Sequence, residues 1–275
     1  MSTFKTLNSI EFVAYLQREL GELGVGAIDL DSNLASDLQL DSLGIYLVID
    51  TILELAEVRQ EPDDAQIGVF TTVRDLYTWY LTIASLPNLE KVDRGSALGR
   101  DGGMVGRLSK LRVVRSDDFL PLYEIAISND IAWRWRYGGA VPTYEDFVRT
   151  FSNGVLVQFI ITDIHTGRLV GLAATYSFNP QYRTAYIAAM IAPEFLMTGV
   201  GIDGIRTFIR YVMKVWDLHK IYMEVPEFNF DQFSAGIGSI FLLEGTLRED
   251  IYLATRRWDK LICAIYRSEF MTKWG

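Results

Sequence analysis

The sequence predicts two domains of different class, an all-α domain over residues 1–84 and a mixed α/β domain over residues 108–275. Apolar residues in the first segment recur at helical spacing, whereas those after residue 108 fall in short runs that are typical of strands. The first segment also has 14 acidic and 4 basic residues, while the rest of the chain has 21 acidic and 22 basic residues. Such a charge asymmetry indicates two units with different partners.

The all-α domain is expected to contain three or four helices and no strand. Asp41 or Ser42 can cap the second helix, because short polar side chains accept hydrogen bonds from the first amides of a helix. Ser9 can cap the first helix in the same way. The helices that periodicity defines span residues 8–22, 42–57 and about 72–84.

Residues 85–107 are rich in Gly, Asp, Arg and Ser and lack any hydrophobic period, so they are predicted to be an interdomain linker. The α/β domain follows. Its expected strands are 111–115, 155–162, 169–178, 182–191, 220–225, 241–252 and 261–267, and its expected helices are 117–129 and 201–216. Gly167 ends a hairpin turn that starts at Asp163, and the helix before residue 220 provides a crossover. The pattern indicates a mixed sheet.

Charge and composition exclude several classes of function. An acidic segment repels nucleic acid and anionic lipid, and no apolar run approaches the roughly 18 residues of a membrane span, so neither partner is expected. No signal peptide opens the chain, and we expect a cytoplasmic protein. Cys263 lies in an apolar alternation and is predicted to be a buried strand residue. With one cysteine and two histidines, His165 and His219, no metal site is expected.

Asp41-Ser42-Leu43 opens an apolar helix, and a Phe-Thr-Thr-Val-Arg-Asp-Leu segment starts at Phe70. This pair of motifs resembles the acyl/peptidyl carrier protein family across residues 1–84, although Gln39 stands where many members have glycine. The resemblance implies a four-helix bundle in which a phosphopantetheinyl transferase attaches 4′-phosphopantetheine to Ser42. A phosphodiester is favoured there by the free amides of the helix N-terminus. The alternative is a bundle in which Ser42 only caps a helix.

A Gly-x-Gly turn at Gly199 and Gly201 lies between a strand and a helix, where backbone amides can bind an anion. Together with Glu244-Gly-Thr-Leu-Arg248 and a closing Asp…Tyr-x-x-Glu-Phe, residues 108–272 resemble the GNAT superfamily, and most closely its ribosomal-protein N-terminal acetyltransferase branch. The resemblance implies a largely antiparallel sheet with helices on both faces. It also implies that Gly199, Val200 and Gly201 bind the diphosphate of acyl-CoA, but Leu196 replaces the polar residue that usually starts this loop.

The resemblance also suggests roles in direct acyl transfer, which needs a base, a group that polarises the thioester and an acid. Glu224 is the candidate base, and Asn229 is a cofactor contact. Backbone amides between Ala189 and Ile191 would polarise the thioester carbonyl. The family's usual acid, a tyrosine, is replaced by Gly236, so the candidate acids are Tyr186, Tyr222 and Tyr252.

These motifs predict an N-acyltransferase that moves a carrier-tethered acyl chain onto an amine, with a peptide N-terminus as one acceptor class. The acyl chain would come from a polyketide synthase or another acyl-loading enzyme of a polyketide or fatty-acid pathway. Asp50, Glu54 and Glu57 would form the acidic face that such partners recognise. One alternative is acetyl-CoA-dependent acetylation of an aminoacyl group held on the carrier. The other is a degenerate domain that only docks the carrier.

Overall fold

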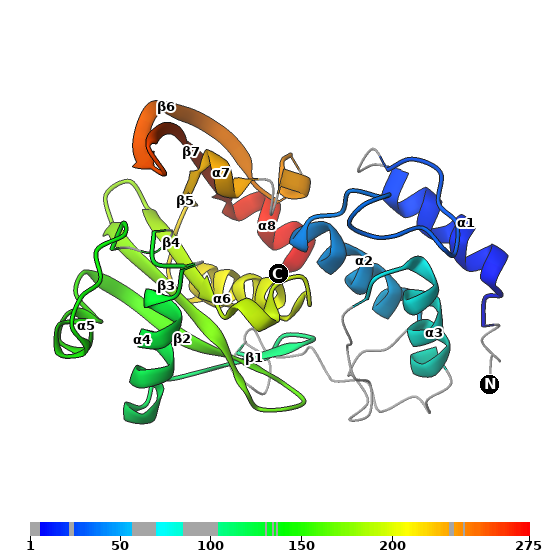
Figure 1. Ribbon diagram of the computed structural model, residues 1–275, viewed down its shortest axis with the longest axis horizontal. Coiled ribbons are helices and arrows are strands. Elements are labelled where there is room, and N and C mark those ends of the chain that lie inside the picture. The colour runs from blue at the N-terminus through cyan, green and yellow to red at the C-terminus, as the bar shows by residue number, and fades with distance from the viewer. Residues whose placement is uncertain are drawn as a thin grey trace.

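The computed structural model describes residues 6–21, 25–56, 70–84 and 104–275, except residues 130, 134, 136, 231–233 and 239. Most of the predicted linker, residues 85–103, lies outside these ranges, as does Glu57. Figure 1 shows a sheet with helices packed on it and a smaller group of three helices beside it. No helix in the described part of the chain is long and apolar enough to cross a membrane.

The N-terminal helices are α1 (Ser9–Leu20), α2 (Ser42–Leu55) and α3 (Val73–Ala84). The α1 cap is Asn8 rather than Ser9, because Asn8 and Glu11 form a reciprocal capping box. Asp41 caps α2, with its Oδ1 accepting from the Gly44 amide at 2.6 Å. The helices pack through buried apolar side chains, such as Phe12, Leu16, Ile52, Leu53, Leu76 and Tyr80. The described residues therefore show a three-helix unit, and a four-helix bundle is not shown.

Seven strands form one sheet in the order β1-β2-β3-β4-β5-β7-β6. Their bounds are β1 Ser109–Arg112, β2 Val155–Asp163, β3 Leu169–Asn179, β4 Thr184–Ile191, β5 Lys220–Pro226, β6 Leu242–Leu253 and β7 Arg256–Tyr266. All neighbours are antiparallel except β4 and β5, which helix α6 (Val200–Val215) connects as a crossover. The predicted mixed, largely antiparallel sheet is confirmed.

Helices cover both faces of this sheet, as predicted (Figure 1). On one face, α4 (Phe119–Ile127) and α5 (Tyr144–Thr150) bury a small core around Leu122, Phe147 and Met190. On the other face lie α6 and α8 (Arg267–Trp274), with the short α7 (Glu227–Phe230) after β5. The core on this second face continues without a break into the core of the N-terminal helices, because α2 packs directly on α6.

Candidate functional site

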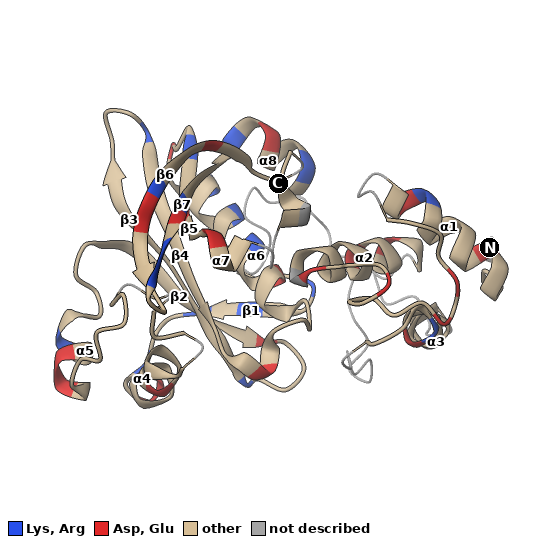
Figure 2. Ribbon diagram, turned by 45° about the horizontal axis from the view of Figure 1, so that its top comes forward, with Lys and Arg blue, Asp and Glu red and all other residues tan. Residues whose placement is uncertain are grey.

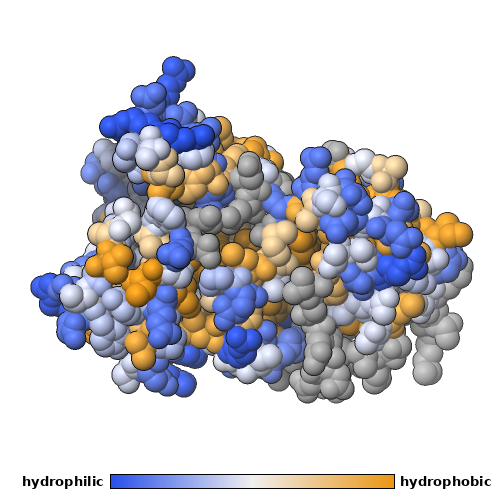
Figure 3. Space-filling model, viewed as in Figure 1, coloured by the Kyte–Doolittle hydropathy of each residue, from blue (hydrophilic) through white to orange (hydrophobic). Residues whose placement is uncertain are grey.

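The site forms where β4 and β5 separate. The two strands pair only from Thr184 to Tyr186 on β4 and from Lys220 to Tyr222 on β5. Beyond Tyr186 and Tyr222 they diverge, and a cavity of about 860 Å³ extends through the opening. Its walls include the diverging ends of both strands, the start of α6, the apolar side of α5 and the start of α2. In Figure 3, apolar residues gather in the hollow between the sheet and the N-terminal helices.

The diverging end of β4 presents backbone amides to the cavity. Ala189 and Ile191 both line it. In an antiparallel ladder, successive residues direct their N–H groups to opposite sides. The Ala192 amide donates to Val170 on the β3 side at 2.8 Å, and the β3–β4 register is regular from Tyr186 to Ile191. The Ala189 and Ile191 amides therefore face β5, where no strand pairs with them, and can donate to an oxygen in the cavity.

The predicted anion loop closes one end of the cavity. Gly199 is the N-cap of α6 at φ 80°, a left-handed conformation that glycine adopts without strain. Gly201 lies against Ile191, since a Cβ there would come within 3.0 Å of Ile191 Cγ2. Gly199 and Gly201 line the cavity, whereas the Val200 side chain is buried and its amide donates to Thr198 Oγ1 at 3.4 Å. The first amides of a helix lack intrahelical partners and can bind an anion.

Glu224, the candidate base, lies on the diverging end of β5 and lines the cavity. It is the one carboxylate among the described lining residues. Its side chain is 40% exposed, and its nearest cation is Lys260 Nζ at 3.7 Å. Lys260 also pairs with Asp250 at 2.6 Å, so its ion pair with Glu224 is the longer and weaker of the two. An incompletely paired carboxylate in an apolar cavity can accept a proton from a bound amine.

The candidate acids Tyr186 and Tyr222 lie next to the cavity but do not line it. With Tyr176 they form a row across β3, β4 and β5, with ring centroids 5.7 Å and 5.2 Å apart. Burial, together with the charge of Glu224, raises the pKa of Tyr186, so its hydroxyl is protonated at neutral pH. Of these three tyrosines, only Tyr176 contributes to the wall. Tyr252 lies on the β6–β7 hairpin and is 67% exposed.

Asn229 on α7 lines the cavity, and its Oδ1 is buried with no hydrogen-bond partner among the described residues. A buried acceptor without a partner costs free energy unless a ligand supplies a donor. An amide N–H of a pantetheine chain is such a donor. The Asn229 side chain can therefore accept a hydrogen bond from the predicted cofactor at this position.

Helix α2 contributes Leu43 and Tyr46 to the cavity wall. Ser42 is the first residue of α2, although its side chain lies outside the described part. Sequence reasoning did not find Leu43, Tyr46 or Arg206 of α6 as wall residues, because their roles depend on contacts between the two units. Among the described residues, no group of three or more His, Cys, Asp or Glu side chains is arranged to hold a metal ion.

No protein-family model matches this chain, and no relative was found among the curated proteins. Solved structures do match. One is the spermidine N-acetyltransferase from Vibrio cholerae in complex with CoA and spermine, with a TM-score of 0.52, 23% identity, and coverage of 60% of this chain and 98% of that chain. Another is a GNAT-family acetyltransferase from Bacillus anthracis, with a TM-score of 0.50, 21% identity, and coverage of 60% and 99%. The α/β unit therefore has the GNAT fold.

Proposed function

We propose that the protein is an N-acyltransferase that moves an acyl group from a phosphopantetheine thioester on Ser42 to an amine, with a peptide N-terminus as one acceptor class. The observation that carries the proposal is the cavity between β4 and β5. It combines two backbone amides that face the cavity, the Asn229 Oδ1 without a hydrogen-bond partner among the described residues, and a single carboxylate, Glu224. These are the groups that direct transfer from a pantetheine thioester to an amine requires.

In the proposed reaction the amine nitrogen attacks the thioester carbonyl carbon. Glu224 accepts the proton that the nitrogen loses, and the amides of Ala189 and Ile191 donate to the carbonyl oxygen as it gains negative charge. The carbon–sulfur bond then breaks. The products are an amide and a pantetheine thiolate, which takes up a proton. Tyr176 in the wall, or Tyr186 next to it on β4, is the phenol that we propose for that step.

The donor arm fits Ser42 because both neighbours of this residue reach the α/β unit. Asp41 Oδ2 accepts from Ser234 Oγ at 3.2 Å, and Leu43 lines the cavity. An arm that begins between them starts at the cavity rim. In this proposal a phosphopantetheinyl transferase attaches the arm and a polyketide synthase or another acyl-loading enzyme charges it, so the proposed role is in natural-product biosynthesis.

A second candidate uses acetyl-CoA as donor and an aminoacyl group on the carrier as acceptor. It is favoured by the bound CoA in the matching Vibrio cholerae structure. The two candidates differ in which substrate the arm on Ser42 carries. A domain that only docks the carrier would give no product with either.

The test starts with intact-protein mass after incubation with a phosphopantetheinyl transferase, CoA and magnesium. We expect one phosphopantetheine per chain and none on Ser42→Ala. The arm is then charged with acyl groups and mixed with a panel of amines. Loss of the acyl mass together with formation of an amide supports the proposal. Product that requires added acetyl-CoA and an aminoacyl arm supports the second candidate, and an unmodified Ser42 contradicts the carrier role.

A further inference from the structure

Helix α2 covers the anion loop at the start of α6. A Cβ on Gly199 would come within 3.1 Å of Ile49 Cδ1 and 3.6 Å of Tyr46 Cδ2. Ile49 and Tyr46 are buried, with exposed fractions of 0% and 1%. The loop that would hold the diphosphate of a CoA molecule is therefore packed against two buried side chains of α2 in the N-terminal unit.

We infer that docked α2 replaces the nucleotide half of CoA, so that the cavity takes a thioester tethered to the same chain and excludes free acyl-CoA. This inference rests on the proposed function and extends it by naming the donor class and the residues that select it. Tyr46 and Ile49 act as the steric filter. A diphosphate forced against them would lose water, and it would gain no hydrogen bond from Ile49 or from the Tyr46 hydroxyl, which lies within 3.5 Å of Asp50 and Asp203.

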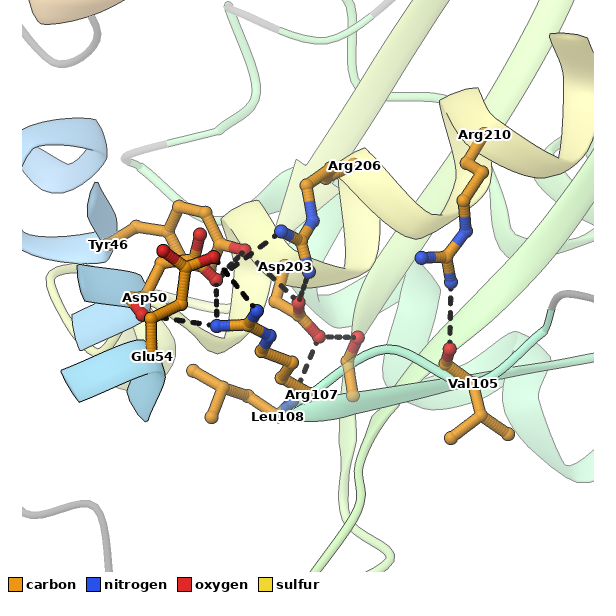
Figure 4. Close-up of polar contacts among 10 residues, drawn as sticks. Tyr46, Asp50, Glu54, Val105, Arg107, Leu108, Asp203, Arg206 and Arg210 are labelled. Atoms are coloured by element: carbon orange, nitrogen blue, oxygen red, sulfur yellow. Dashed lines mark hydrogen bonds and ion pairs between the residues drawn. The ribbon is translucent and has the colours of Figure 1, made fainter. Parts of the chain in front are cut away.

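A buried network of charges holds α2 in this position (Figure 4). Arg107 lies 2.6 Å from Asp50 Oδ1, and Arg206 bridges Asp50 at 3.4 Å and Asp203 at 2.9 Å. The Tyr46 hydroxyl lies 3.4 Å from Asp203 Oδ1. Two arginines balance two aspartates, so the network leaves no net buried charge. Removing one partner of such a buried pair is strongly destabilising, because the other charge is then uncompensated.

Burial raises the pKa of Asp50, although Arg206 and Arg107 offset part of this effect. The two arginines therefore favour the charged form of Asp50 against the effect of burial. Glu54 also contacts Arg107, at 3.3 Å. Figure 2 shows the acidic N-terminal helices beside the basic positions of α6. The acidic face expected to recognise other enzymes is thus used, in part, by the chain's own α/β unit.

The residue at position 236 fits the same arrangement. A Cβ on Gly236 would come within 2.5 Å of both Leu43 Cδ2 and Phe241 Cε1, so glycine leaves room for these two side chains. Arg206 lines the wall and is only 12% exposed, with its guanidinium over the rings of Tyr46 and Trp274 at 5.2 Å and 5.0 Å. The diphosphate–nucleotide chain of a CoA molecule would meet α2 itself.

The first experiment measures CoA binding to the full-length chain by calorimetry. Asp50→Arg places a third cation against Arg107 and Arg206 and should release α2. Gly236→Leu should displace α2 by a different route, because the new side chain would occupy the space of Leu43. Asp31→Arg is the matched control, because Asp31 pairs with Arg74 within the N-terminal unit and is 81% exposed. We expect wild type and the control to bind CoA at least tenfold more weakly than the two releasing variants. Hydrogen exchange of the α2 amides reports whether each variant has undocked.

Three outcomes would overturn the inference. Wild type binding CoA as tightly as the releasing variants, with α2 still protected from exchange, shows that α2 does not block the cleft. Absence of CoA binding in variants whose α2 has undocked shows that something other than α2 excludes it. If Asp50→Arg and Gly236→Leu stay folded and their α2 amides remain protected from exchange, the contacts at Asp50 and Gly236 do not hold α2 in place. None of these results affects the proposed N-acyltransferase, which is judged by amide formation from the charged Ser42 arm.

A second experiment tests delivery within one chain. A charged Glu224→Gln chain, which has a donor arm and no base, is mixed with an uncharged Ser42→Ala chain, which has a base and no arm. Delivery within one chain predicts an initial rate of amide formation below about a hundredth of the wild-type rate at equal concentration, the size of a lost general base. An initial rate near that of wild type would show transfer between chains and overturn this part of the inference.

Discussion

Replacing Glu224 by Gln isolates the proton transfer in the proposed reaction. Glutamine keeps the size and polarity of the side chain but cannot accept a proton. General-base catalysis contributes about 10²- to 10⁴-fold. Since Glu224 is 40% exposed, water can partly replace it, and we place the effect in the lower half of that range. We expect the single-turnover rate to fall about 10²- to 10³-fold, which is about 2.7 to 4 kcal/mol in the activation free energy.

The assay follows the charged arm on Ser42 by intact mass after mixing with saturating amine. Glu244→Gln is the matched control, since Glu244 also pairs with a lysine, Lys220 at 2.7 Å, but lies outside the cavity wall. The difference in rate between wild type and Glu224→Gln should become smaller as the pH rises toward the pKa of the amine. At that pH much of the amine is already neutral in solution and can attack without a base on the protein. A rate within threefold of wild type at pH 7, or an equal loss in the Glu244 variant, refutes the role of Glu224 as base.

Three further predictions concern stability, measured by urea unfolding. Gly204→Ala should lower the free energy of unfolding by about 1 to 3 kcal/mol, because its Cβ would lie 2.3 Å from Ile161 Cγ2, whereas Gly21→Ala should not, because nothing lies within 4 Å. Burial raises the pKa of Cys263 from 9.0 to about 11, so wild type should lose stability relative to Cys263→Ala as pH rises from 9 to 11. Burial raises the pKa of Asp118, but hydrogen bonds from an arginine side chain and a backbone amide outweigh it and hold this pKa below its ordinary value of 3.8. The advantage of wild type over Asp118→Asn should therefore be constant at neutral pH and be lost as pH falls below about 4.

The sequence predicted the central strands well, because their apolar alternation is a local signal. The strand expected at residues 220–225 is observed as Lys220–Pro226, and the one expected at 155–162 as Val155–Asp163. Two other strand boundaries were less accurate. The first strand was expected at residues 111–115 and lies at Ser109–Arg112, and β7 begins at Arg256, five residues before its predicted start at 261. Partly exposed polar stretches carry no alternation that marks where a strand begins.

The site was predicted only where a motif carries it. The glycines of the α6 turn and the carboxylate at Glu224 lie in the cavity wall, and their functional roles stay predictions. Tyr186 and Tyr222 were chosen by residue type alone, and neither lines the cavity, because the strands are still paired at these two positions. The short α5 and the C-terminal α8 were not predicted. Each has only 7 or 8 residues, which is too few for a periodic pattern to be distinctive.

Two departures from the GNAT pattern have one explanation once α2 is docked. Leu196 takes the place of a polar residue at the start of the anion loop, and Gly236 takes the place of a tyrosine. Leu196 lines the same cavity as Leu43, and Gly236 gives Leu43 its space. A cleft that holds a CoA diphosphate gains from a polar side chain at the loop, whereas a cleft covered by an apolar helix gains from leucine and from an absent side chain. The two substitutions that weaken the case for an acyl-CoA enzyme therefore strengthen the case for a tethered donor.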